Sequence, residues 1–326
     1  MPNYNGVWSL STQYQYNTDW QADNVSPARA AATTAARGLF ALGKDSGNPI
    51  DPIDQINTVS EGNATDFGDL TQGRQDPGAL ASATRGVFGG GYTTSSDTDR
   101  IDYVSMASAG NAIDFGNLAA ANEGVAALSS ATRGVFAGGY TSSAVVNIIQ
   151  YITIANTGNT TDFGDLTVAR YLPCGAGSPT RGIFAGGTTG SLSNVMDYIT
   201  IASTGNASDF GNLSAATQSP GGASSATRAL FAGGQGTGRA NSEFIEYVTI
   251  ANTGNVTDFG DLTAGRQLIS ACSNSIRGIY AGGGASASNV IDFVVITTTG
   301  NASDFGDLTA NAWEGAGCCS SHGGIA

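Results

Sequence analysis

The chain has 326 residues, of which 40% are hydrophobic and 12% charged, a composition too apolar for a disordered chain. Its formal net charge of -13, with 26 acidic and 13 basic residues, argues against nucleic-acid binding, because contacts to phosphates need a cationic surface. The N-terminal sequence shows no basic start with an apolar run, and no stretch is long enough to span a membrane. We therefore expect synthesis in a cytoplasm, without signal-directed export or membrane insertion.

Two short motifs recur along the chain at intervals of 46 to 49 residues. The first is an arginine followed by a small, an aliphatic and an aromatic residue, and it begins at Arg37, Arg85, Arg133, Arg181, Arg228 and Arg277. The second is a DFG(D/N)L block, whose first aspartate is Asp66, Asp114, Asp162, Asp209, Asp258 or Asp304. Asp19 lies 47 residues before Asp66, which indicates a further copy at the N-terminus. A period of this length is typical of a repeat architecture.

Each repeat predicts four short strands, a to d, separated by turn residues. In the third copy these are residues 124–130, 133–139, 147–155 and 160–167. Strand a is rich in Gly, Ala, Ser and Cys, whereas strands b and c carry larger apolar residues. Small side chains suit strands that converge on an axis, so each sheet is expected to stack on its neighbours in a ring.

The fold predicted from this pattern is an all-β, seven-bladed β-propeller with four-stranded antiparallel blades. It forms one domain over residues 1–326, and residues 1–20 and 310–326 are expected to share one blade. In that blade, the C-terminal strands a and b would meet the N-terminal strands c and d, in a two-plus-two closure. Such a closure would remove the exposed sheet edges of an open ring.

The recurring charged residues predict a structural ring. The arginine precedes strand b and the aspartate follows the c–d turn, so both are expected at the same end of the blade, where they can pair. The ring would comprise Arg37, Arg85, Arg133, Arg181, Arg228, Arg277, Asp19, Asp66, Asp114, Asp162, Asp209, Asp258 and Asp304. A ring of ligand contacts is the alternative, but an element present in every blade is more simply structural.

The unit resembles the kelch repeat: FAGG at 184–187, then the strand c tyrosine Tyr198, then the strand d aromatic Phe210, and DLTVAR ending at Arg170. The tryptophan expected in strand d is Phe in six copies, and Trp20 takes its place in one. The copies are nearly identical in sequence, as in TRGIFAGG at 180–187, and this repeat sequence resembles those of propeller proteins of tailed, especially marine, bacteriophages. This second resemblance implies a virion component.

A non-enzymatic virion protein is therefore the leading functional prediction. It would be a tail, fibre or surface module that binds other virion proteins or a host-surface glycan or receptor. The alternatives are a carbohydrate-active propeller enzyme, with carboxylates in the central mouth, and an intracellular kelch-type adaptor. His322 is the only histidine, and no motif supports it in a catalytic triad.

The b–c loops differ in sequence between otherwise uniform repeats, which favours the loop-bearing end as the recognition face. Arg74, Arg170 and Arg266 each lie in a d–a connection, one in every second repeat, and are expected at the same end. The binding candidates are Lys44, Tyr92, Asp97, Asp99, Arg100, Tyr140, Arg239, Arg74, Arg170 and Arg266. Tolerance of surface variation is the alternative explanation of the loop differences.

No cofactor or metal ion is expected. Paired carboxylates such as Asp66 and Asp69 offer ligands to Ca²⁺, but six or more oxygens would have to converge on the ion. Cysteines occur at positions 174, 272, 318 and 319 without the spacing of a metal site, and we expect free thiols. Five Asn-X-Ser/Thr sequons lie in the c–d turns and are attributed to turn geometry.

Overall fold

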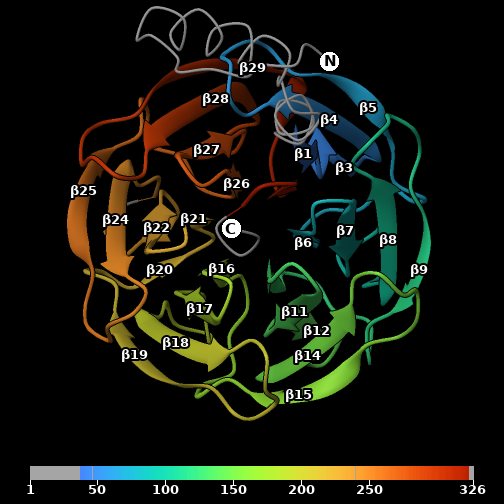
Figure 1. Ribbon diagram of the computed structural model, residues 1–326, viewed down its shortest axis with the longest axis horizontal. Helices are drawn as coiled ribbons and strands as arrows, with labels where there is room; N and C mark the ends of the chain where they lie inside the picture. Colours follow the sequence, from blue (N-terminus) through green and yellow to red (C-terminus); the bar gives the residue numbers. More distant parts are fainter. Residues whose placement is uncertain (1–36, 46, 239, 323–326) are drawn as a thin grey trace, which may run out of the picture. The chain divides into compact units, whose positions relative to one another are not determined.

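The computed structural model describes residues 37–45, 47–238 and 240–322, and it contains strands and turns throughout these ranges. All of these residues belong to one compact unit. This unit is a β-propeller whose sheets are arranged around a central axis (Figure 1). Within the described ranges, no helix is long and apolar enough to cross a membrane.

Six four-stranded antiparallel sheets form the blades, and their strands are ordered from the axis outwards. Blade 1 contains β30 (Ala316–Cys319), β1 (Arg37–Ala41), β4 (Pro52–Asn57) and β5 (Thr65–Asp69). Blade 2 contains β6 (Gly78–Ala81), β7 (Arg85–Gly89), β8 (Arg100–Ser105) and β9 (Ile113–Asn117). Blade 3 contains β10 (Ala126–Ser129), β11 (Arg133–Ala137), β14 (Ile148–Thr153) and β15 (Thr161–Asp165).

The remaining blades repeat this order. Blade 4 contains β16 (Cys174–Gly177), β17 (Arg181–Ala185), β18 (Val195–Thr200) and β19 (Ser208–Asn212). Blade 5 contains β21 (Gly221–Ser224), β22 (Arg228–Ala232), β24 (Phe244–Thr249) and β25 (Thr257–Asp261). Blade 6 contains β26 (Ser270–Ser273), β27 (Arg277–Ala281), β28 (Ser288–Val295) and β29 (Ser303–Ala312).

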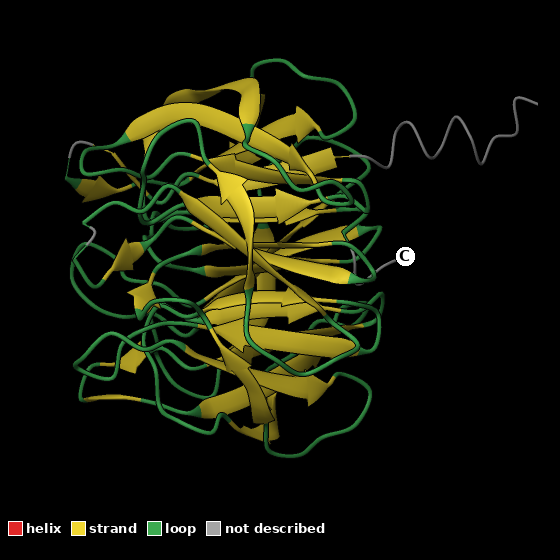
Figure 2. Ribbon diagram, turned by 90° about the vertical axis from the view of Figure 1, so that its left-hand side faces the viewer, coloured by secondary structure: helices red, strands yellow, loops and turns green. Residues whose placement is uncertain are grey.

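Three short two-stranded sheets lie outside the blades. They are β2 (Lys44–Asp45) with β3 (Asn48–Pro49), β12 (Tyr140–Thr141) with β13 (Ala144–Val145), and β20 (Thr217–Gln218) with β23 (Gln235–Gly236). They lie at one end of the propeller with the b–c loops and the d–a connections, on the left in Figure 2. We call this end the b–c face, and the opposite end, which carries the a–b and c–d turns, the a–b face.

The described residues form six blades, where the sequence predicted seven, and the closure also differs. The C-terminal strand β30 pairs with β1, with Cys318 opposite Leu39, so the closing blade takes one strand from the C-terminal end and three from residues 37–69. The innermost strands contact one another in a closed cycle, since β30 contacts both β6 and β26. The predicted two-plus-two closure is therefore wrong for the C-terminal half. Its N-terminal part, residues 1–20 with Asp19, lies outside the described residues.

The core lies between the blades rather than within them. Six clusters of buried apolar residues each draw on two neighbouring sheets. Phe163 of blade 3, for example, packs in the same cluster as Phe184 and Ile199 of blade 4. A four-stranded sheet cannot bury both of its faces alone, so stability depends on this stacking. Four buried free cysteines are among the described residues, Cys174, Cys272, Cys318 and Cys319, all on inner strands, which confirms free thiols.

The outer edge of each blade is covered by the c–d segment of the next blade. The amide of Gly158 donates to the carbonyl of Phe115, and the Asn159 Oδ1 accepts a 3.0 Å hydrogen bond from the amide of Asn117. The same contacts recur around the ring, including Gly62 to Phe305 between blades 1 and 6. The sequon asparagines thus bond neighbouring blades, and the positive φ in these turns belongs to the glycine that precedes each asparagine. This pairing satisfies strand edges that would otherwise be exposed.

Candidate functional site

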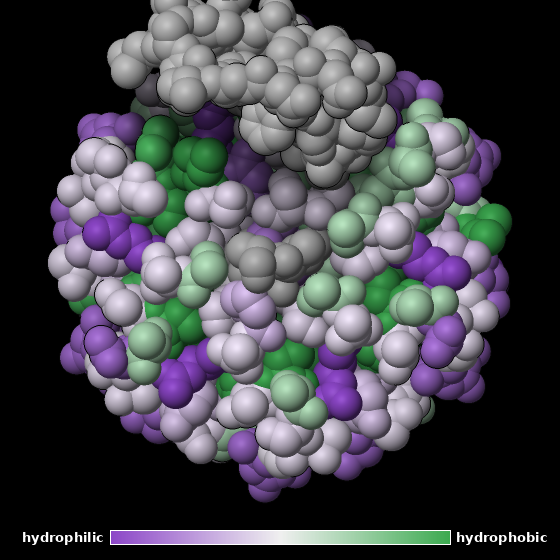
Figure 3. All heavy atoms as spheres, in the orientation of Figure 1, coloured by the Kyte–Doolittle hydropathy of each residue, from purple (hydrophilic) through white to green (hydrophobic). Residues whose placement is uncertain are grey.

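The six arginines of the predicted ring each begin the second strand of a blade, at the a–b face. Arg133 is representative: its guanidinium carbon lies 4.4 Å from the centroid of the Tyr151 ring, and its Nη1 donates a 2.8 Å hydrogen bond to the carbonyl of Ile201 in the next blade. Equivalent bonds to the next blade are made by Arg37, Arg85, Arg181 and Arg228. Hydrophilic residues accordingly recur between hydrophobic ones around this face (Figure 3).

The expected pairing of these arginines with the ring aspartates does not occur among the described residues. Arg133 is opposite Thr153 in the sheet, whereas Asp162 is opposite Gln150, three residues further along the same strand. That offset corresponds to roughly 10 Å along the strand, too far for an ion pair. The ring aspartates that are described, namely Asp66, Asp114, Asp162, Asp209, Asp258 and Asp304, are exposed on the outermost strands. Asp19 lies outside the described residues.

Arg74, Arg170 and Arg266, which we expected to contact a ligand, are instead buried between blades. Their Nη2 atoms lie 3.0, 2.6 and 2.5 Å from carboxylate oxygens of Asp102, Asp197 and Asp292, respectively, on the third strand of the next blade. These arginines are at most 3% exposed, so a ligand at the surface cannot reach them. The expectation failed because the d–a connection passes beneath the b–c loops and directs the side chain inwards.

The b–c face carries a ring of short pairings around the axis. The beginning of a b–c loop pairs with a d–a connection, as in the pairs Tyr92–Gln75, Tyr140–Glu123, Thr188–Tyr171, Gln235–Gln218 and Lys44–Trp313. Lys44 lies on this ring, and its Nζ is 3.6 Å from Glu314 Oε2 and 5.7 Å from the centroid of the Trp313 ring. The rings of Tyr140 and Tyr171 meet edge to face, with centroids 5.9 Å apart.

The other predicted binding residues lie further from the axis or outside the described ranges. Asp97 accepts a 3.0 Å hydrogen bond from the Ser142 hydroxyl, which joins the loops of blades 2 and 3. Arg100 begins β8 and its Nη1 donates to Thr71 Oγ1 at 3.3 Å, next to the half-buried Asp99. Arg239 is not among the described residues. Lys44, Tyr92 and Tyr140 are thus the sequence candidates that lie on the ring of pairings around the axis.

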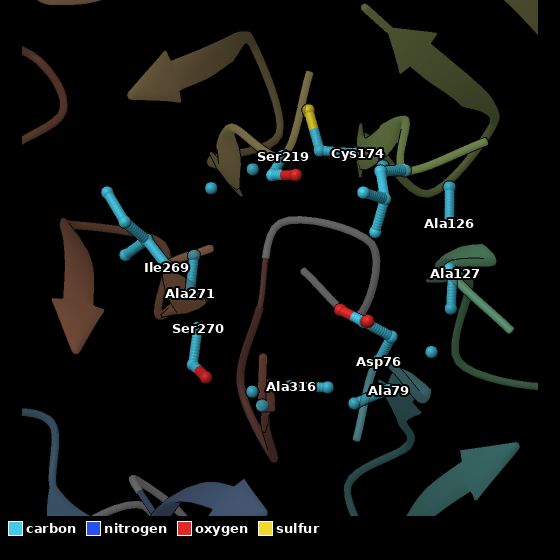
Figure 4. Close-up of a pocket in the computed structure, with 18 of the residues that line it drawn as sticks. Asp76, Ala79, Ala126, Ala127, Cys174, Ser219, Ile269, Ser270, Ala271 and Ala316 are labelled. Atoms are coloured by element: carbon cyan, nitrogen blue, oxygen red, sulfur yellow. The ribbon is translucent and has the colours of Figure 1, made fainter. Parts of the chain in front are cut away.

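A narrower ring of six residues surrounds the axis just inside these pairings. They occupy the same place in the six d–a connections, all with φ of 51° to 62°, and are Asp76, Gly124, Leu172, Ser219, Leu268 and Glu314. The amide of Asp76 donates to the carbonyl of Glu314 at 2.6 Å, and that of Gly124 to Asp76 at 3.0 Å, so a backbone hydrogen-bond belt runs from blade to blade. We call these six residues the axial ring. Below them lies a cavity of about 120 Å³ (Figure 4).

Carboxylates gather on one side of the axial ring. Asp76 is 9% exposed, and burial raises the pKa of its carboxyl well above the ordinary value, with further contributions from the charges of Glu314 and Glu123; Lys44 and Gln75 oppose this rise. Burial also raises the pKa of Glu314, opposed by Lys44. The pKa of Glu123 is raised by burial and by Asp97. Among the described residues, this side of the axial ring therefore places three carboxyl groups near one cation, Lys44.

The opposite end of the axial channel is lined by Gly, Ala, Ser and Cys of the innermost strands and by His322. The His322 Nε2 lies 2.8 Å from the carbonyl of Ala81 and 3.0 Å from Ser129 Oγ, and burial lowers the pKa of its imidazole to about 4. A neutral ring whose Nε2–H donates to Ala81 fits this environment. His322 therefore links the C-terminal segment to blades 2 and 3.

The described residues contain no group of three or more His, Cys, Asp or Glu side chains arranged to hold a metal ion. Comparisons with known protein families and with curated proteins found no match for this chain. The repeat architecture and the axial mouth are thus the observations from which a function has to be argued.

Sequence reasoning missed the residues nearest the axis, above all Asp76, Glu123, Trp313 and Glu314. The signal was present in the repeat alignment, because the axial-ring position holds Asp, Gly, Leu, Ser, Leu and Glu in the six copies. A position that changes its chemistry within otherwise uniform repeats is a candidate for recognition. The b–c loops differ more in length and sequence than this single position does, so the sequence pointed to the loops.

Proposed function

We propose that this propeller is a non-catalytic binding module that presents its b–c face to a partner. The observation that carries the proposal is that structurally uniform blades place chemically different residues around the axis on the b–c face. Blades 1 to 4 supply charged and aromatic residues, namely Lys44, Trp313, Glu314, Asp76, Tyr92, Glu123, Tyr140 and Tyr171, whereas blades 5 and 6 supply Gln218, Gln235, Gln267 and Gly284. Aromatic residues that combine an apolar ring with a polar tip are favoured in binding surfaces.

A virion is the proposed setting, with another virion protein or a host-surface glycan as the partner. The resemblance of the repeat sequence to those of phage propeller proteins supports this setting. Mass spectrometry of purified particles of the encoding phage is expected to detect the chain in stoichiometric amounts. Its absence from particles that package DNA normally would contradict the proposal.

The face assignment has its own test. Tyr140→Ser with Trp313→Ser changes the b–c face, whereas Val59→Ser with Ile276→Ser changes exposed apolar residues, 59% and 58% exposed, belonging to the a–b and c–d turns. We expect the first pair to reduce incorporation into particles or adsorption to host cells, and the second pair to leave both unchanged. The reverse result would move the recognition surface to the a–b face.

A carbohydrate-active enzyme is the second candidate, favoured by the raised pKa values of Asp76 and Glu314 beside aromatic residues. The size of the cavity disfavours it. Small-molecule sites usually enclose roughly 300–1,000 Å³, and the axial cavity encloses about 120 Å³. Release of reducing sugars from host polysaccharides, abolished by Asp76→Asn, would replace the binding proposal with this one.

A further inference from the structure

The axial ring has two chemically different sides. Asp76 and the neighbouring Glu314 place carboxylates on one side, whereas Leu172 and Leu268 place apolar side chains on blades 4 and 6. Leu172, Leu268 and Glu314 are half-buried, so the ring is continuous with the surface of the b–c face. An entering group would therefore meet negative charge and apolar surface at the same level of the channel.

Two buried polar groups of the cavity are only partly satisfied by the described residues. Asp76 is 9% exposed and shares a hydrogen bond with the Gln75 side chain, but it forms no ion pair among these residues, and Figure 4 shows its carboxylate extending into the cavity. Ser219, in the blade opposite, is also 9% exposed, and its Oγ has no hydrogen-bond partner. Buried polar groups are normally hydrogen-bonded, and a buried carboxylate is costly without a counter-charge. A ligand group that donates hydrogen bonds and carries positive charge would complement both side chains.

The number of carboxylates and the volume of the cavity favour some cations over others. A calcium ion needs six or more oxygen ligands, whereas no three carboxylates of the described residues converge. A cavity of about 120 Å³ is also too small for a large branched or polycyclic ligand. An ammonium group needs only one carboxylate and a few acceptors, and it arrives on a slender methylene chain that can lie along apolar walls.

We infer that the axial cavity binds the ammonium group of a linear alkylamine, presented as a lysine side chain by the protein that docks on the b–c face. Asp76 accepts hydrogen bonds from the ammonium, Ser219 Oγ completes its coordination, and Leu172 and Leu268 contact the methylene groups. This inference rests on the proposed binding role of the b–c face and specifies what that face recognises.

The test is an NMR titration of the full chain with Nα-acetyl-lysine-N-methylamide. We expect saturable binding, weakened about tenfold or more by Asp76→Asn, because a charge-assisted hydrogen bond is lost. Asn tolerates the positive φ of this position, so the variant should fold. Ser219→Ala should weaken binding by a smaller factor, roughly two- to tenfold. Asp97→Asn, which removes an acidic group on the same face outside the cavity, should have no effect.

Two control probes make the outcomes distinct. The Nε-acetylated probe, which lacks the charge, should not bind, and cadaverine should bind through Asp76 if a free amine can replace the lysine. No saturable binding to the folded protein, or equal binding by Asp76→Asn, would overturn the inference, as would Asp76-dependent binding of Ca²⁺ that displaces the amine. Particle incorporation through the b–c face would stand in each of these cases, so the two proposals fail separately.

Discussion

Arg170 and Asp197 form an ion pair between blades 3 and 4, with 2.6 Å between Nη2 and Oδ2, and both side chains have no exposed surface. Burial lowers the pKa of the guanidinium, while the Asp197 charge raises it. Equivalent pairs occur at Arg74 and Arg266 in alternate blades. Such a pair need not stabilise relative to apolar residues, but losing one partner leaves a buried charge uncompensated.

Replacing Arg170 by Met should therefore lower the free energy of unfolding by about 3 kcal/mol, because Asp197 would keep only the hydroxyl and amide of Thr167. The matched control is Arg181→Met, which removes a half-buried arginine stacked on Tyr198 and should cost about 1 kcal/mol. Urea unfolding of both variants measures the difference. Equal losses would show that the buried pair has no special importance.

His322 gives the propeller a pH dependence of known sign. Burial lowers the pKa of its imidazole from 6.5 to about 4, so between these values the unfolded chain binds a proton that the folded chain does not. Stability contributed by the neutral imidazole is thus present above pH 6.5 and is lost as the pH falls towards 4.

In His322→Gln, whose amide can still donate to the Ala81 carbonyl, the decrease in unfolding free energy between pH 7 and pH 4.5 should be smaller than in the wild type. Denaturant unfolding at the two pH values measures it. The carboxyl groups are common to both proteins, so their contribution cancels. An identical decrease in both proteins would contradict the assignment.

At the scale of strands and turns, the outer hydrogen bonds between blades depend on close backbone contact. A Cβ on Gly116 in β9 would lie 2.3 Å from the carbonyl oxygen of Gly158, in the c–d segment of blade 3. Gly158 has a similar φ, 155° against 148°, but a Cβ there would meet nothing within 4 Å. The two glycines therefore separate the effect of backbone strain from that of the contact between blades.

Gly116→Ala should destabilise the propeller by about 2 kcal/mol more than Gly158→Ala, because only the first substitution forces the neighbouring backbone away. Thermal unfolding of the two variants side by side provides the measurement. Hydrogen exchange should also speed up at the amide of Gly158, which donates to Phe115. Similar losses in both variants would mean that strain alone accounts for the glycines.

At the scale of the whole molecule, the ring closes through β30 of the C-terminal segment. Its pairing with β1 completes blade 1, and the hydrogen bond from the Asp76 amide to the Glu314 carbonyl continues the belt of the axial ring across the same junction. On the outer side, Gly62 donates to Phe305. The ring is therefore closed at three distances from the axis: at the axial ring, in the β30–β1 pairing, and at the outer edge of the blades. In each case the contacting residues lie far apart in the sequence.

Deleting residues 316–326 should open the ring and expose β1, and we expect aggregation or a large loss of thermal stability. Deleting residues 323–326 keeps every described strand and serves as the control. Deleting residues 1–20 should leave the six sheets intact, in contrast to the two-plus-two closure that the sequence suggested. A soluble monomer after the first deletion, seen by light scattering, would show that β30 is dispensable.

The repeat itself was readable from the sequence, because four strands per unit need recurring turn residues, alternating side chains and small residues near an axis. The DFG(D/N)L and arginine motifs placed strands d and b correctly in every described copy, as in β15 and β11 of blade 3. The small residues of strand a likewise predicted the innermost position of β10 and β16. These features are local, so one repeat carries them all.

The number of blades and the partners of charged residues were decided only in the folded ring. Strand a of the C-terminal segment has the same sequence character whichever sheet it joins, so the closed cycle of inner strands selected β1 as its partner. Arg133 reached a carbonyl and a tyrosine face rather than Asp162, because register within the sheet separates the two. Asp76 and Ser219 came together around one cavity because six d–a connections converge on the axis, a contact between distant repeats that no single repeat contains.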